Sequence, residues 1–463
     1  MKTILHLLTC LFIGQLSYAE GQPNLIYIMV DDMGVGDLGC YGQKKIKTPE
    51  LDRMAEMGMR FTQHYAGSAV CAPSRCILMT GKHGGHAYIR ANSPGYPGGQ
   101  TPIPKGTETL ATMLKREGYA TACVGKWGLG GSHNVGGANK QGFDLFFGYY
   151  DQRHAHEYYT DHLWKNDQKV PLDGKTYSHD LMTKEAFQFM DENHENPFFL
   201  YLAYTIPHTK FQVPELGQYE DKPWEKNHKT QAAMISYLDR DIGRLLKKLN
   251  DLGISENTLV TFTSDNGAHG QSGTGEFFNA TAGLRGIKRS LYEGGVRTPF
   301  LAYWPGKIKA GSTSDHISIH YDTMATYAEL TGATPKSSHD GISYLPTLLG
   351  KKKDQKTHDH LYWELYEGKA NRAVRMGKWK GVYPDLNKNE TFQLFNLEKD
   401  EKEMTDLSTQ YPEIVEKLQS IIKKEHVDNP FWNLASKGFN TKAACDANGV
   451  VPMKKKPKKK PKK

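Results

Sequence analysis

The sequence predicts an α/β fold with a large domain built on a mostly parallel sheet and a smaller C-terminal α+β domain. Apolar runs of strand length at residues 24–30, 119–124, 198–204 and 259–263 alternate with segments of helical periodicity, a pattern typical of βαβ units. Each of these runs is followed by polar residues, and ligands of open α/β sheets bind at the carboxyl ends of the strands. Short strand-like segments gather after residue 350 and indicate the second domain.

Length and charge set limits on this prediction. A chain of 463 residues is too long for one ordinary hydrophobic core, so one large and one smaller domain are expected. The formal net charge is +8, but residues 454–463 contain eight lysines and no acidic residue. The rest of the chain is close to neutral, so the charge predicts no specific nucleic-acid partner.

The N-terminal residues have the layout of a secretory signal peptide. Lys2 precedes an apolar run at residues 4–16, and Ser17-Tyr18-Ala19 follows it, with cleavage expected after Ala19. The run is too short to span a membrane, so we expect a periplasmic or secreted protein. Removing residues 1–19 leaves five cysteines, an odd number that predicts no disulfide framework.

The first half of the chain contains two of the predicted strands. Residues 24–30 (NLIYIMV) form an apolar, β-rich run without a polar face and predict a strand buried on both faces. Asp31 and Asp32 follow it, and two adjacent carboxylates that lose hydration favour a bound cation; the alternative is a solvated acidic turn. Next we expect a helix from Pro49, a strand at 60–65, a helix at 108–117 and a strand at 119–124 that leads to Lys126.

The second half continues the alternation after an irregular section. Residues 131–175 have little periodicity, and we interpret 143–164 as loops over the active face. The strand at 198–204 leads to His208, and the strand at 259–263 leads to Asp265-Asn266. A helix at 230–249 lies between these strands, and a strand at 300–304 and a helix at 322–330 complete the large domain.

The C-terminal part predicts a small antiparallel sheet with one helix. The polar connector 350–356 marks a domain boundary, and short strands are expected at 361–365, 372–376, 379–383 and 392–396, with an amphipathic helix at 412–424. The predicted divisions are therefore a signal peptide at 1–19, a large domain at 20–350 and a small domain at 351–440. A disordered basic tail at 441–463 follows, because Lys and Pro cannot build a core.

The stretch Cys71-Ala72-Pro73-Ser74-Arg75 indicates chemistry. It predicts a loop entering a helix, whose N-terminus would stabilise an anion beside Arg75 and lower the pKa of the Cys71 thiol. The alternative is a buried structural cysteine beside a capping serine. The stretch continues to Thr80-Gly81-Lys82 and resembles the signature C-x-P-S-R…T-G-[KR] of the type I sulfatases.

The resemblance extends from about residue 24 to residue 434. Within the family, the sequence is similar to a branch of bacterial polysaccharide sulfatases and arylsulfatases. This resemblance implies an alkaline-phosphatase-like fold for the large domain. It also implies that a separate maturing enzyme oxidises Cys71 to formylglycine (3-oxoalanine), whose hydrate is the nucleophile. The family's metal ligands correspond to Asp31, Asp32, residue 71, Asp265 and Asn266. These are hard oxygen donors once residue 71 is modified, and they suit Ca²⁺.

The same resemblance assigns catalytic roles. Arg75, Lys126 and Lys288 would neutralise the sulfate oxygens and the charge that develops on the bridging oxygen. His208 would act as general acid toward the leaving alcohol. The implied reaction is attack of a hydrate oxygen on sulfur to give a sulfate hemiester, which then expels sulfate as the aldehyde re-forms. The expected function is therefore removal of sulfate from a sulfated carbohydrate.

One position departs from the family pattern. Relatives commonly read G-K-W-H-L-G, with a histidine that contacts the hydrate, whereas this chain has Gly128. Either a nearby residue such as His133 substitutes, or turnover relies on Asp265 and solvent. Other polar and aromatic side chains of the loops suit a galactose-type sugar, and the substrate contacts we expect are Arg90, Asn92, His133, His154 and His156.

Two other functions compete with this prediction. One is a phosphatase or phosphodiesterase of the same superfamily, which the lack of a His-rich zinc ligand set disfavours. The other is a non-catalytic binder of sulfated glycans in which Cys71 stays a thiol. The expected partners are a sulfated saccharide and the enzyme that matures Cys71, with no membrane span and no specific nucleic acid.

Overall fold

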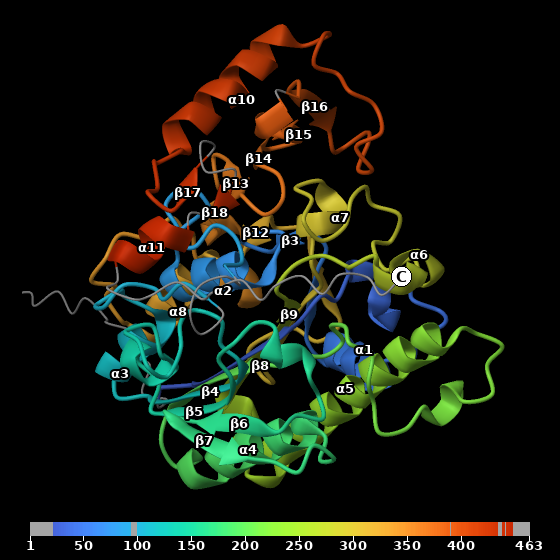
Figure 1. Ribbon diagram of the computed structural model, residues 1–463, viewed down its shortest axis with the longest axis vertical. Coiled ribbons are helices and arrows are strands. Elements are labelled where there is room, and N and C mark those ends of the chain that lie inside the picture. Colours follow the sequence, from blue (N-terminus) through green and yellow to red (C-terminus); the bar gives the residue numbers. More distant parts are fainter. Residues whose placement is uncertain (1–21, 94–99, 389, 434–437, 440, 448–463) are drawn as a thin grey trace, which may run out of the picture.

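The computed structural model describes residues 22–93, 100–388, 390–433, 438–439 and 441–447 (Figure 1). The predicted signal peptide at 1–19 and residues 448–463 of the predicted tail lie outside the described residues. Within the described part of the chain, no helix is both long and apolar enough to cross a membrane.

A ten-stranded sheet among the described residues forms the centre of the large domain, in the order β11-β2-β10-β9-β1-β8-β4-β5-β6-β7. Neighbouring strands from β9 to β5 are parallel, and β10 is antiparallel to both β9 and β2. The strands are β1 Asn24–Val30, β2 Met59–Phe61, β4 Ala120–Lys126, β5 Leu145–Tyr149, β6 His162–Lys165, β7 Gln168–Pro171, β8 Phe198–Ala203, β9 Thr258–Ser264, β10 Phe300–Tyr303 and β11 Ser312–Ser314. The predicted α/β fold with a mostly parallel sheet is confirmed.

Helices cover both faces of this sheet. Alternate residues of β1 belong to two different hydrophobic clusters: Leu25, Tyr27 and Met29 pack with residues of α2, α3 and α8, while Ile26 and Ile28 pack with residues of α1, α4 and α5. This two-sided burial explains why residues 25–30 of the strand include no charged or amide side chain. The helices of the large domain are α1 Pro49–Met57, α2 Cys71–Thr80, α3 Leu110–Arg116, α4 Ser178–Asn193, α5 Lys226–Asp251, α6 Thr274–Phe277, α7 Glu293–Val296, α8 Asp322–Thr331 and α9 Leu345–Leu348.

The C-terminal part contains an antiparallel sheet in the order β13-β14-β15-β16, as predicted. Leu418 and Ile422 of α10 pack on Tyr362, Val374 and Leu394 of this sheet, which lies above the large domain in Figure 1. The elements are β13 Leu361–Leu365, β14 Asn371–Met376, β15 Trp379–Tyr383, β16 Gln393–Asn396, α10 Pro412–Glu425, β17 Trp432–Asn433, β18 Gly438–Phe439 and α11 Thr441–Ala447.

Three sequence interpretations differ from the structure. The strand predicted at 60–65 is split into β2 and β3 His64–Tyr65, and β3 pairs with β12 Ser318–Ile319 in a separate small sheet. Residues 143–164 are not all loop, because β5 extends the parallel sheet and β6 follows it. Gly148 of β5 permits this pairing, since a Cβ there would lie 2.0 Å from the carbonyl oxygen of Gly125. Helix α4 was not predicted.

Candidate active site

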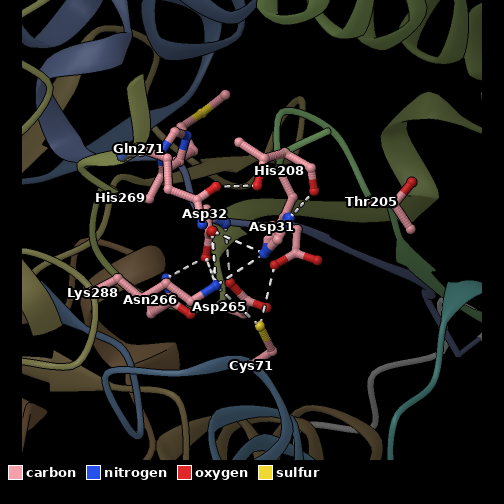
Figure 2. Close-up of polar contacts among 12 residues, drawn as sticks. Asp31, Asp32, Cys71, Thr205, His208, Asp265, Asn266, His269, Gln271 and Lys288 are labelled. Atoms are coloured by element: carbon pink, nitrogen blue, oxygen red, sulfur yellow. Dashed lines mark hydrogen bonds and ion pairs between the residues drawn. The ribbon is translucent and has the colours of Figure 1, made fainter. Parts of the chain in front are cut away.

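Four adjacent strands of the sheet deliver polar side chains to one place. Asp31 and Asp32 follow β1, Lys126 ends β4, His208 lies beyond β8, and Asp265 follows β9. These strands are neighbours in the order β9-β1-β8-β4 and are parallel, so their carboxyl ends lie at the same edge. Figure 2 shows that the labelled side chains from β1, β8 and β9 converge on the region above Cys71.

Cys71 is the first residue of α2, and its side chain is almost completely buried. Its Sγ atom lies 3.4 Å from Oδ1 of Asp31 and 3.6 Å from Nζ of Lys288. Burial and the charge of Asp31 raise the pKa of the thiol to about 12. The expectation that the helix N-terminus lowers this pKa is therefore wrong, because desolvation and a neighbouring carboxylate outweigh the helix dipole.

The carboxylates and the amide form a cluster of oxygen donors. The main-chain N–H of Asp32 donates to Oδ1 of Asp265 (3.2 Å), and Nδ2 of Asn266 donates to Oδ1 of Asp32 (2.8 Å). Oδ1 of Asn266 is buried without a hydrogen-bond partner. With Asp31, these side chains present several oxygen atoms and one unsatisfied acceptor, which is the donor chemistry that a calcium ion requires. The residues therefore fit the implied metal.

Three buried cations balance the three carboxylates. The Arg75 guanidinium donates to Oδ2 of Asp265 from Nε (3.2 Å) and Nη2 (2.8 Å). Nζ of Lys126 lies 2.5 Å from Oδ2 of Asp31, and Nζ of Lys288 lies 2.7 Å from Oδ1 of Asp32. The charge of a bound Ca²⁺ would leave this pocket positive, so it would attract an anionic substrate.

The three carboxylates differ in the direction in which their pKa values are shifted. Burial alone would raise the pKa of Asp31, but Lys126 and the other nearby cations hold it well below its usual value. Burial also opposes ionisation of Asp32, and Lys288 holds its pKa low. Burial and the charge of Asp31 instead raise the pKa of Asp265 to about 7, although Arg75 opposes the rise. Three buried carboxylates in one place are easier to ionise together when a metal cation joins them.

His208 lies beside Lys288. Its Nε2 is 3.1 Å from Nζ of Lys288 and 3.2 Å from Oδ2 of Asp32, and its Nδ1 is hydrogen bonded to the carbonyl oxygen of Thr209. Burial lowers the pKa of His208 to about 4. At neutral pH the ring is therefore uncharged, with Nδ1–H donating to the carbonyl and Nε2 accepting from the lysine ammonium.

Two of the expected substrate contacts have structural partners. The Arg90 guanidinium donates to the carbonyl oxygens of Gly85 and Ala87 and pairs with Glu364 at 3.3 Å. This buried placement does not fit a substrate contact, because each of its nitrogen atoms already has a partner. Oδ1 of Asn92 accepts the main-chain N–H of Ala72 at 3.1 Å, so Asn92 supports the start of the helix that carries Cys71.

The three expected histidines lie in different places. His133 is exposed and, with His154 and Trp164, lines a cavity of about 220 Å³. Nε2 of His154 is hydrogen bonded to the hydroxyl of Thr160 (2.6 Å). The ring of His156 stacks on that of His208, with centroids 3.6 Å apart. Of these three, His156 has a described contact with a candidate catalytic side chain.

Two residues near the site were missed by the sequence interpretation. His269 is buried, its Nε2 has no hydrogen-bond partner, and burial lowers its pKa. Thr205, which follows β8, also has a buried hydroxyl without a partner; in Figure 2, His269 lies beside the cluster and Thr205 stands apart from it. The position of His269, four residues after Asp265, was the signal in the sequence that could have indicated it.

Comparisons with known proteins agree with this geometry. The sequence profile of the family described as Sulfatase matches residues 23–333, and one described as "N-sulphoglucosamine sulphohydrolase, C-terminal" matches residues 286–428. N-acetylgalactosamine-6-sulfatase of Mus musculus is 34% identical over 399 residues, which cover 78% of this chain and 72% of the relative. N-acetylgalactosamine-6-O-sulfatase of Bacteroides thetaiotaomicron is 28% identical over 493 residues, covering 87% of this chain and 93% of that protein.

A solved structure extends the comparison to three dimensions. The crystal structure of Ps i-CgsB in complex with k-i-k-neocarrahexaose superimposes with a TM-score of 0.77 and 28% sequence identity. The superposition covers 92% of this chain and 98% of that one. The likeness therefore includes both the large sheet and the C-terminal sheet.

Proposed function

This chain belongs to the sulfatase family and hydrolyses sulfate esters, and we propose that its substrate is a sulfated saccharide of galactose type. We further propose that residue 71 is converted from cysteine to formylglycine and that the site holds Ca²⁺. The family membership disfavours the phosphatase, and the non-catalytic binder differs from this proposal in keeping Cys71 as a thiol.

One observation carries the mechanistic part of the proposal. Sγ of Cys71 lies within 3.4 Å of Asp31 and 3.6 Å of Lys288, at the start of a helix and inside a cluster of oxygen donors. An unmodified thiol there is a poor nucleophile, because its pKa is raised to about 12. A modified residue 71 supplies a hydrated aldehyde, and the metal supplies positive charge that favours ionisation of that hydrate.

The chain's own cations bind and orient the sulfate. Lys126 and Lys288 approach the cluster from different elements, and Arg75 is held in place by Asp265. These three groups neutralise the sulfate oxygens in a site from which water is excluded, where such charges act most strongly. The proton for the leaving oxygen comes from the Lys288–His208 pair, whose nitrogen atoms are 3.1 Å apart.

The sugar is inferred from the relatives. Two of them are sulfatases of N-acetylgalactosamine 6-sulfate by their names, and this supports a galactose-type ring with sulfate at its 6-position. The expected signal peptide supports a periplasmic or secreted location, where extracellular polysaccharides can be reached. A separate maturing enzyme is the partner that the modification of Cys71 requires.

Mass spectrometry of the peptide that contains residue 71 tests the modification. Conversion of the Cys71 side chain to the aldehyde replaces the SH group and one Cβ hydrogen by a carbonyl oxygen, which lowers the peptide mass and makes the peptide reactive toward hydrazides. Recovery of only the unmodified thiol from an active preparation would refute the proposed nucleophile.

A panel of regioisomers tests the substrate. Galactose and N-acetylgalactosamine sulfated at the 6-position, the same sugars sulfated at the 4-position, and N-acetylglucosamine 6-sulfate are compared by sulfate release. The largest kcat/KM is expected for a 6-sulfated galactose-type sugar. A clear preference for a gluco-configured sugar or for the 4-sulfates would overturn the assignment.

A further inference from the structure

Position 128 has no side chain, and the space beside it is filled from another segment. Gly128 has a φ of +75°, and a Cβ there would lie 1.6 Å from Nε2 of Gln152. A larger residue would therefore meet both backbone strain and a clash. Both amide atoms of Gln152 are buried without a hydrogen-bond partner. The segment that carries Gln152 thus brings unsatisfied polar atoms to the end of β4.

The same segment places His156 against the catalytic histidine. His156 is the last residue of the short 3-10 helix His154–His156, and its ring is nearly parallel to that of His208, at 12° and 3.6 Å between centroids. The Tyr158 hydroxyl lies within hydrogen-bond distance of the carbonyl oxygens of Thr205 (2.9 Å) and His208 (2.6 Å). These contacts hold the segment and the His208 loop together.

His156 has a ring nitrogen without a partner, on the ring that stacks against His208. Its Nε2 atom is buried without a partner, and an unpaired buried polar atom is costly unless a ligand satisfies it. Burial and the proximity of His208 and Lys126 lower the pKa of His156 to about 2, so the ring is neutral. Asp31 and Lys288 also act on this ring, and both lie within hydrogen-bond distance of Cys71.

We propose that His156 contacts the substrate in the sulfatase reaction, donating a hydrogen bond from Nε2 to an oxygen of the sulfuryl group while its ring supports His208. A neutral imidazole N–H can donate without adding charge beside three cations. The inference rests on the sulfatase function, and it gives a defined atom and partner to His156, which the sequence analysis named as a substrate contact.

Two substitutions separate the hydrogen bond from the stacking. His156→Phe keeps a flat ring that can lie on His208 and removes the donor, while His156→Gln keeps an amide N–H near the position of Nε2 and removes the ring. Loss of a hydrogen bond to a charged group predicts a fall in kcat/KM of roughly 10- to 100-fold for the Phe variant. The Gln variant is expected to retain most of the activity.

The measurement uses 4-nitrophenyl sulfate and a 6-sulfated galactose-type sugar, with His162→Phe as a control from the same region. An equal loss of kcat/KM on both substrates for the Phe variant supports a contact with the sulfuryl group, which the two substrates share. A Phe variant as active as wild type, a loss confined to the sugar, or equal losses in the Phe and Gln variants would each overturn the proposal. Wild-type cleavage of the aryl sulfate without the sugar would refute the proposed substrate only.

Binding of the product gives a second readout that does not depend on turnover. Inorganic sulfate should raise the Tm of the wild-type enzyme, and the His156→Phe variant should need about tenfold more sulfate for the same shift. The Tm values without sulfate show whether the variant folds. An unchanged sulfate response in a folded Phe variant would contradict the inferred hydrogen bond.

Discussion

Two buried charge clusters among the described residues look alike in composition and differ in their surroundings. The active-site cluster consists of Asp31, Asp32, Arg75, Lys126, Asp265 and Lys288. The interface cluster joins α7 to the C-terminal sheet and consists of Glu293, Arg297, Arg375, Lys380 and Glu403. In both clusters, acidic and basic side chains pair inside the protein.

The surroundings separate the two clusters. In the interface cluster, Nζ of Lys380 lies 2.8 Å from Glu293 and 3.1 Å from Glu403, and the Tyr65 hydroxyl donates to Glu293. Oε1 of Glu403 in that cluster has no hydrogen bond but is ion-paired with Lys380, whereas Oδ1 of Asn266 and Nε2 of His269, around the active-site cluster, are buried without a partner. Buried ion pairs alone therefore do not identify a functional site. Unsatisfied polar atoms at the carboxyl ends of parallel strands do indicate one.

The largest effect on activity is expected from Cys71→Ala. It removes the precursor of the nucleophile, so sulfate release should fall by more than about a thousandfold. The Tm should change by only a few degrees, because a small side chain is lost. Sulfate release and thermal unfolding are measured together, with Cys76→Ala in the same helix as the control. Wild-type-like release from Cys71→Ala would remove residue 71 from the mechanism.

The largest effect on stability is expected from Lys380→Met in the interface cluster. The change leaves the carboxylates of Glu293 and Glu403 buried without their shared cation, which should lower the free energy of unfolding by about 3–5 kcal/mol. Denaturant unfolding measures this, with the exposed Lys378→Met as the control. A stable Lys380→Met variant with lost activity would show that the two clusters do not differ as proposed.

Removal of calcium should affect the active-site cluster alone. Chelation is expected to lower the stability of the wild-type protein by about 3 kcal/mol at a calcium concentration near one hundred times its Kd. Thermal unfolding with EGTA and with added Ca²⁺ measures the difference. Asp31→Asn should reduce the calcium-dependent shift and Lys380→Met should keep it. An unchanged wild-type Tm after chelation would argue against a structural calcium ion.

The smallest effect is expected in the pH dependence of the interface cluster. Burial raises the pKa of Glu403 to about 7, with Lys380 opposing the rise and Glu293 adding to it. Because the folded pKa lies above the unfolded value, the contribution of this group to stability is full below about pH 4.5 and is lost as the pH rises through 7. Glu403→Gln should therefore lose less stability than wild type between these pH values. If the free energy of unfolding changed equally in the two proteins between these pH values, the raised pKa would be contradicted.

Much of the fold was predictable because it depends on local patterns. The run at residues 24–30 is strand β1 without a shift in its ends, and the run at 361–365 is β13, since mostly apolar and β-prone residues of strand length have few other places to lie. The metal and nucleophile candidates were also accessible, because Asp31, Cys71 and Asp265 stand in short motifs at the ends of elements.

The sequence by itself determined the central strands of the large sheet and the four strands of the C-terminal sheet, that polar groups follow the central strands, and that the Cys71 motif resembles that of a sulfatase. Only the tertiary structure decided that Arg90 is bound to Glu364, that the Cys71 thiol is hard to ionise, and that His156, not His133, lies on His208. The physical reason is the sequence separation of the residues that determine each property. Periodicity reports local burial, whereas loop positions and pKa values depend on through-space contacts between residues far apart in the chain.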